Sequence, residues 1–264
     1  MNKRRFSEID VVRGVAVVGM VIYHVLFDLS LLGLIDLRIS RTAFEILAWA
    51  TAGTFFTVVG ISLYISFSRT RSVGPEQDGL LGKYLVRGAK LVAWGLGITL
   101  VSYLLYPDFA VFFGALHFIG VSVVLSYFFL ELTFDFRKSV FLFLVFSMAL
   151  LLFALSGAVR GSRVEHPFLL WIGMVPQGFQ SLDYFPLLPW FGFVVGGLAI
   201  GELLYPGGRR SYDFYAFENR PLEFLGRYSL IIYLAHQPLI YLAIFLFLSF
   251  SSGGGSSLSS LLSF

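Results

Sequence analysis

Long apolar runs separated by short polar segments are the dominant pattern of this chain. Seven runs are close to the roughly 20 residues that an α-helix needs to cross a bilayer. They occupy residues 9–35, 44–67, 84–105, 109–130, 140–155, 185–204 and 229–250. We predict an all-α polytopic integral membrane protein whose helices form a single bundle. The run 140–155 is the shortest, and Pro238 should kink the last helix because proline removes a backbone hydrogen bond.

The amino-acid composition agrees with a membrane protein. Hydrophobic residues make up 57% of the 264 residues and charged residues 13%, against about 25% charged residues in soluble domains. We expect one transmembrane domain over residues 1–250. A Ser- and Gly-rich tail over residues 251–264 is predicted to be disordered. The chain has no cysteine, which excludes disulfides and thiol chemistry.

The basic residues predict how the chain lies in the membrane. Positively charged residues stay on the cytoplasmic side of short loops, and most of the 19 Lys and Arg residues share one side if the N-terminus is cytoplasmic. We therefore expect a multi-pass protein with a cytoplasmic N-terminus, in the cell membrane of a prokaryote. The same rule accounts for the net charge of +3, so no nucleic-acid partner is implied. The oligomeric state stays open, with a homodimer among the options.

Four ionisable residues interrupt the first apolar run: Asp10, Arg13, His24 and Asp28. Arg13 and His24 are eleven residues apart, which in an α-helix is three turns plus about 20° and a rise of roughly 16 Å. All four side chains therefore share one stripe of the helix. Ionisable groups at this depth cost several kcal/mol against lipid, so the stripe should face protein or a wet cavity.

Three of the four histidines lie within predicted spans, namely His24, His117 and His236. They could converge in one cavity, where an imidazole can move a proton near neutral pH. Asp28 could orient His24 and stabilise its protonated form. The alternative for His117 and His236 is a hydrogen-bonded histidine between helices. Histidine spacings typical of metal sites are missing, so we expect no metal.

Polar residues near the ends of the spans complete the candidate site. Asp183 precedes the sixth span and either caps that helix or contacts a polar substrate from outside. Just before it, residues 167–175 are too short to span and should form a lid or a re-entrant piece. At the inner ends, Arg227 lies four residues after Glu223 and forms either an exposed ion pair or a contact to an anionic ligand.

Arg87 and Lys90 form a second cationic pair at the inner end of the third span. Phosphate ligands favour such clusters. Topology alone would also place positive residues there.

Several motifs together resemble a known superfamily. IDVVRGVAVVGMVIYH followed by VLFD resembles the opening helix of the transmembrane acyltransferase superfamily, and its Arg, ten residues and His match membrane acyltransferases of the acyltransferase-3 type. Asp10, Arg13 and Gly14 are also similar to the heparan-α-glucosaminide N-acetyltransferase catalytic-domain family. GALHFIGVS, DYFPLLPWFG and LGRYSLIIYLAHQP follow in the order expected for that family.

The resemblance implies transfer of an acetyl or other acyl group from cytoplasmic acyl-CoA to a hydroxyl or amine of a sugar-like or glycan-like acceptor outside. On that basis His24 is the general base, supported by Asp10 and Asp28, and Arg13 contacts CoA or positions the site. Since no histidine lies between His24 and His117, the role falls on His24 or on a more distant residue.

The other candidates follow from the same resemblance and from the chemistry of the reaction. Arg87, Lys90 and Arg227 would bind the acyl-CoA co-substrate, while His117, Asp183, His236 and Gln237 would contact the acceptor. Gln237 and His236 could also stabilise an oxyanion at the kinked seventh span. The acceptor, the acyl chain length and the choice between CoA and a lipid as donor stay open.

A different class of function is a transporter or flippase for a small solute or lipid, with the charged first helix lining its pathway. Inverted repeats with broken helices would favour it, and the sequence contains no such repeat. A purely structural subunit would leave the membrane-embedded Arg13 and His24 unexplained.

Overall fold

The computed structural model describes residues 5–36, 41–72, 79–159, 161–212 and 219–251. By their contacts the residues divide into two compact units. Unit 1 comprises Met1–Phe55 and Tyr215–Phe264, and unit 2 comprises Phe56–Phe214. The two units are described separately. The single transmembrane domain over residues 1–250 stays a prediction, and residues 252–264 of the expected tail lie outside the described part.

Seven helices within the described residues are long and apolar enough to cross a membrane, as predicted. They are α1 (Ser7–Leu31), α2 (Arg41–Arg71), α3 (Leu80–Leu105), α4 (Ala115–Thr133), α5 (Lys138–Val159), α6 (Leu187–Leu204) and α8 (Ser229–Ser251). The prediction that the fifth span is the shortest was wrong, because α5 has 22 residues and α6 only 18. The apolar run underestimated α5 because this helix continues into polar residues at its ends.

The fourth helix begins six residues later than its apolar run. Residues 107–109 form the short 3-10 helix η2 (Pro107–Phe109), and α4 starts at Ala115 after Gly114. Hydropathy alone does not separate a turn of apolar residues from the helix that follows, which explains the difference.

Unit 1 contains α1, the first part of α2, the short helix α7 (Arg220–Arg227) and α8. The Asn219 side chain caps α7 by accepting a hydrogen bond from Leu222 N at 3.1 Å. Two glycines let α1 and α7 touch backbone to backbone. A Cβ on Gly14 would collide with the Leu222 carbonyl, and one on Gly226 with the Asp10 carbonyl.

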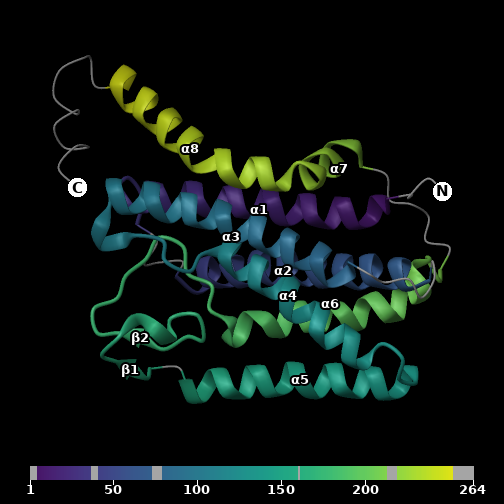
Figure 1. Ribbon diagram of the computed structural model, residues 1–264. Helices are drawn as coiled ribbons and strands as arrows, with labels where there is room; N and C mark the ends of the chain where they lie inside the picture. The colour runs from purple at the N-terminus through teal and green to yellow at the C-terminus, as the bar shows by residue number, and fades with distance from the viewer. Residues whose placement is uncertain (1–4, 37–40, 73–78, 160, 213–218, 252–264) are drawn as a thin grey trace. The chain divides into compact units, whose positions relative to one another are not determined.

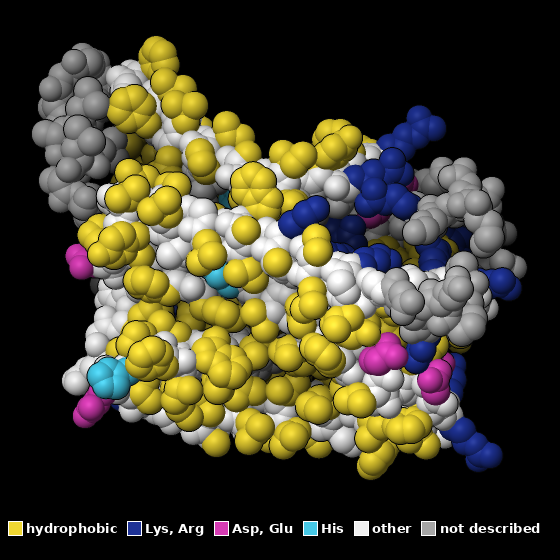
Figure 2. Space-filling view, viewed as in Figure 1, with side chains coloured by type: hydrophobic (Ala, Val, Ile, Leu, Met, Phe, Trp, Pro, Cys, Tyr) yellow, Lys and Arg dark blue, Asp and Glu magenta, His cyan; other side chains and the backbone are white. Residues whose placement is uncertain are grey.

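The last helix continues as an α-helix through Pro238. Figure 1 shows the C-terminal half of α8 bending away from α1. Proline costs the helix one hydrogen bond and crowds the preceding turn, so the expected kink has its physical cause here. Hydrophobic side chains cover much of the surface of α8 in Figure 2.

Unit 2 contains the remainder of α2 together with α3, α4, α5 and α6 (Figure 1). Small residues again set the closest helix contacts, as in other membrane proteins. Gly88 of α3 meets Gly120 of α4, and Gly60 of α2 meets Gly197 of α6. Large apolar side chains fill the core between these contacts, among them Phe56, Phe67, Phe118, Val194 and Leu198, all at most 2% exposed.

The connection between α5 and α6 folds over the beginning of α6. It holds β1 (Arg163–Val164), the 3-10 helix η3 (Pro167–Leu169) and β2 (Val175–Pro176), with β1 and β2 paired in parallel. The carbonyls of Trp171 and Ile172 accept hydrogen bonds from Leu187 N and Leu188 N at 2.8 and 3.3 Å. The segment therefore caps α6 and does not span. After α6, the chain forms the 3-10 helix η4 (Pro206–Gly208).

Candidate functional site

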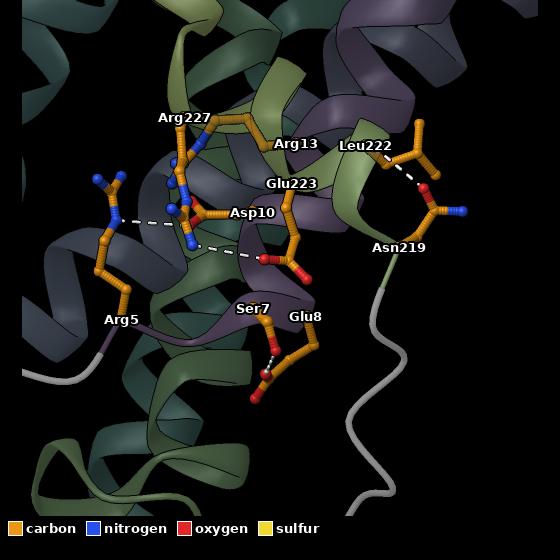
Figure 3. Close-up of polar contacts among 9 residues, drawn as sticks. All are labelled: Arg5, Ser7, Glu8, Asp10, Arg13, Asn219, Leu222, Glu223 and Arg227. Carbon is orange, nitrogen blue, oxygen red and sulfur yellow. Dashed lines mark hydrogen bonds and ion pairs between the residues drawn. The ribbon is translucent and has the colours of Figure 1, made fainter.

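A group of ion pairs surrounds Asp10 at the beginning of α1 (Figure 3). Arg13 Nη1 lies 3.0 Å from Asp10 Oδ1, while Arg5 Nε and Arg227 Nε lie 3.4 and 3.7 Å from Oδ2. Arg227 Nη2 also pairs with Glu223 at 3.4 Å. We call these five residues the Asp10 cluster. With three guanidinium groups and two carboxylates, the cluster carries a net charge of +1.

Burial differs sharply within the Asp10 cluster. The side chain of Asp10 is 4% exposed and that of Arg13 16%, whereas Arg5 and Arg227 are 61% and 48% exposed. The buried pair holds the cluster together, since a buried carboxylate must be paired to be tolerated. The two outer arginines keep donor groups at the surface, where an anion can reach them.

The glycines explain why two distant arginines reach one carboxylate. Gly14 directly follows Arg13, and Gly226 directly precedes Arg227. Because both glycines lie in the backbone contact between α1 and α7, their neighbours are brought to the same place. A side chain at either glycine would separate the helices and with them the cluster.

Further along the same face of α1, His24 meets His236 of α8. The two ring centroids are 4.6 Å apart and the ring planes are inclined at 69°. His24 Nδ1 lies 2.9 Å from Met20 O, and His236 Nδ1 lies 2.6 Å from Tyr233 O. A carbonyl can only accept, so in each neutral ring Nδ1 carries the hydrogen and Nε2 keeps its lone pair. Each Nε2 is thereby prepared to accept a proton.

Asp28 lies one turn beyond His24 and is completely buried. Its neighbours on α8 are Gln237 and Tyr241. Within the described residues no well-formed hydrogen bond reaches either carboxylate oxygen. The His24 ring is held by the Met20 carbonyl, so the structure places Asp28 against α8 and does not show it orienting His24. The polar stripe predicted on α1 thus faces α7 and α8, as its energetic cost requires.

The remaining predicted residues lie in unit 2. His117 of α4 is 5% exposed, stacks on Phe113 with ring centroids 6.0 Å apart, and fits against α3 because Gly95 has no side chain. Neither ring nitrogen of His117 has a hydrogen-bond partner among the described residues. His117 is thus packed between helices, and the alternative of a hydrogen-bonded histidine finds no partner among the described residues. Its contact with an acceptor stays a prediction.

Asp183 also has a structural contact. Its Oδ2 accepts a hydrogen bond from Ala115 N at 3.0 Å. Ala115 is the first residue of α4, so Asp183 caps α4 and not the sixth span that follows it in sequence. Arg87 and Lys90 are exposed on α3, and their assignment to a ligand stays a prediction.

Sequence reasoning missed Arg5 as a member of the Asp10 cluster, and missed Tyr233 and Tyr241 as neighbours of the α8 site residues. The sequence did contain a signal for the contact between α1 and α7 that forms the Asp10 cluster. Glycine next to arginine occurs in both α1 and α7, and small residues in membrane helices mark close helix packing. No comparable signal precedes the tyrosines. Within the described residues, no group of three or more His, Asp or Glu side chains could hold a metal ion.

Comparison with known proteins connects this geometry to a family. The model of the family described as heparan-alpha-glucosaminide N-acetyltransferase, catalytic, matches residues 5–238. The match includes Arg5 at its beginning and Gln237 near its end, so it spans the whole Asp10 cluster and the histidine pair. No curated protein and no solved structure matches the chain. The chain belongs to the heparan-alpha-glucosaminide N-acetyltransferase catalytic-domain family and is a multi-pass membrane protein of this acetyltransferase type.

Proposed function

We propose that the protein transfers an acyl group from cytoplasmic acyl-CoA, acetyl-CoA in the simplest case, to a hydroxyl or amine of a sugar-like acceptor from the opposite side of the membrane. The observation that carries this proposal is the His24–His236 pair, 4.6 Å between ring centroids, on the same face of α1 as the Asp10 cluster. One part of this face can accept a proton and the other can bind an anion. Acyl transfer from CoA needs both.

The Asp10 cluster is the proposed site for the phosphate groups of CoA. Guanidinium groups bind phosphate through paired, charge-assisted hydrogen bonds. Arg5 and Arg227 offer accessible donors, and the buried Arg13–Asp10 pair fixes the position of Arg227. From Arg13 to His24 the helix rises roughly 16 Å, a depth that an extended thiol-bearing arm has to cover.

The proposed reaction uses His24 as the base. The acceptor O–H or neutral amine N–H gives a proton to His24 Nε2 while its oxygen or nitrogen bonds to the thioester carbonyl carbon. The resulting oxyanion is stabilised by the side-chain amide of Gln237, which donates an N–H to it. When the intermediate collapses, the C–S bond breaks and the thiolate of CoA takes the proton from His24. Acyl ester or amide and free CoA are the products.

Donor binding provides the first test. We expect purified protein in lipid nanodiscs to bind acetyl-CoA saturably, and Arg227→Gln to weaken binding at least tenfold, since a hydrogen bond to a charged group contributes about 1.5–3 kcal/mol. Arg220→Gln is the matched control, because Arg220 is also exposed on α7 but lies outside the Asp10 cluster. Arg87→Gln and Lys90→Gln test the predicted second cationic pair in the same assay.

Transfer itself is measured with radiolabelled acetyl-CoA and amino-sugar or polyol acceptors. Label in the acceptor that depends on His24 supports the proposal. Absence of saturable binding of acetyl-CoA and of every longer acyl-CoA would refute it. Solute flux through proteoliposomes without CoA would support the transporter alternative.

A further inference from the structure

An apolar groove of about 560 Å³ lies between α1 and α8 within unit 1. Val21, Val25 and Leu29 form its α1 side, and one face of α8 from Ile231 to Phe247 forms the other. Its lining residues, all within the described part of the chain, are apolar with the exception of His236. The groove follows from the bend in α8, because the half of the helix after Pro238 departs from α1 (Figure 1).

The contacts between α1 and α8 fix the direction of this groove. His24 lies against His236, and Asp28, one turn later, lies against Gln237 and Tyr241. The two helices therefore run parallel. Most of the groove lies between the histidine pair and the C-terminal ends of both helices, and a shorter part lined by Val21, Ile231, Ile232 and Ala235 precedes the histidines.

The length of the groove beyond the histidines sets the size of its occupant. From His236 to Phe247 the helix rises about 16 Å. An extended chain advances roughly 3.5 Å for every three bonds, so about a dozen carbon atoms would fill this distance. An acetyl group would leave nearly all of it empty.

The other end of the groove leads back to the Asp10 cluster. Arg227 is the last residue of α7, and Ile231 follows four residues later in the first turn of α8. Along one face of unit 1 the chain therefore presents accessible cations and then an apolar groove, and His236 lines that groove five residues after its first α8 residue, Ile231. This order matches one kind of molecule, with anionic phosphates at one end, a thioester in the middle and an alkyl chain at the other end.

We propose that the α1–α8 groove holds the alkyl chain of a medium- to long-chain acyl-CoA, so that the donor carries about a dozen carbons in preference to acetyl. The inference rests on the proposed function, because it places the thioester of that donor at His24 and His236. The length of the groove determines the length of the acyl chain that binds best, and the C-terminal half of α8 sets that length.

The test is the dependence of binding on chain length, measured in nanodiscs with unreactive thioether analogues of acyl-CoA from two to sixteen carbons. Each methylene that leaves water should tighten binding about fourfold, both in the groove and in the lipid of the nanodisc, so the same analogues are measured on protein-free nanodiscs, where the gain continues at every length. The gain from the protein should stop at about twelve carbons. Equal binding of the two-carbon and twelve-carbon analogues would overturn the inference while leaving the proposed function intact. If no analogue of any length binds, both fail.

Variants that shorten the groove make the test specific. Ala243 lines the groove seven residues beyond His236, or about 10 Å along the helix. With Ala243→Trp, binding should stop improving at about eight carbons. If this variant does not fold, Ala243→Leu replaces it, and binding should then stop improving at a length between about eight and twelve carbons. Leu242→Trp is the matched control, because Leu242 is exposed on the same turn and does not line the groove. An equal effect of Leu242→Trp and Ala243→Trp would overturn the assignment.

Discussion

The buried ion pair between Arg13 and Asp10 allows a direct test of how unit 1 is held together. Its N–O distance is 3.0 Å, with side chains 16% and 4% exposed. The same helical unit contains a second pair at the same distance, Arg41–Glu45, with side chains 81% and 58% exposed. The two pairs therefore differ in burial and in the additional ion pairs that Asp10 forms with Arg5 and Arg227, and the exposed pair serves as the control.

Asp10→Asn keeps the shape of the side chain and removes its charge. Breaking a buried pair leaves an uncompensated charge and costs about 3–5 kcal/mol, and here three arginines are left facing one another. Glu45→Gln should cost less than about 0.5 kcal/mol, because an exposed pair within a helix contributes that little. Both variants are unfolded reversibly with denaturing detergent, and helix content is followed by circular dichroism. Equal losses of stability in the two variants would show that burial of Asp10 does not matter.

Three further predictions concern packing, capping and a perturbed tyrosine. Gly226→Ala should destabilise the protein by more than about 2 kcal/mol, because its Cβ would meet the Asp10 carbonyl. Gly82→Ala is the control and should be neutral or stabilising, since nothing lies within 4 Å of a Cβ there. Equal melting temperatures of the two variants would contradict this prediction. Asp183→Ala should cost about 1 kcal/mol through loss of the α4 cap without abolishing donor binding, and loss of acetyl-CoA binding in a folded Asp183→Ala protein would show that Asp183 does more than cap. Burial raises the pKa of Tyr184 to about 12, and its hydroxyl donates to Leu170 O at 2.7 Å. The stability that follows from this shift is fully present below pH 10 and is lost as the pH rises toward 12. An ultraviolet difference titration of wild type against Tyr184→Phe should show this late ionisation, and a midpoint near pH 10 would refute it.

The number and approximate limits of the membrane helices could be read from the sequence because lipid demands long apolar runs with internally satisfied backbones. The stripe on α1 was predictable for the same reason, since Asp10, Arg13, His24 and Asp28 follow helical periodicity. What periodicity within one helix cannot show is the partner across the interface. The pairing of Asp10 with Arg227 depends on the register of α1 and α7, which Gly14 and Gly226 set, and the pairing of His24 with His236 depends on how α8 packs against α1.

Caps and short helices were harder to predict. Asp183 resembles an N-cap for the helix directly after it, yet its carboxylate reaches the start of α4, 68 residues earlier in the chain. A short helix such as α7, with eight residues, carries too few turns for its pattern to stand out. In both cases the decisive contact is between segments far apart in sequence, and only the folded chain brings them together.

The central claim is that His24 is the base of an acyl transfer. In the absence of an acceptor, water can slowly hydrolyse the acyl-CoA. The CoA thiol that is released is detected with a thiol reagent, and the protein gives no background signal because the chain has no cysteine. His24→Ala should lower this rate by about 10²–10⁴-fold, whereas His117→Ala, which removes a packed histidine of unit 2, should leave most of it in the folded protein. Equal rates in wild type and His24→Ala would contradict the account.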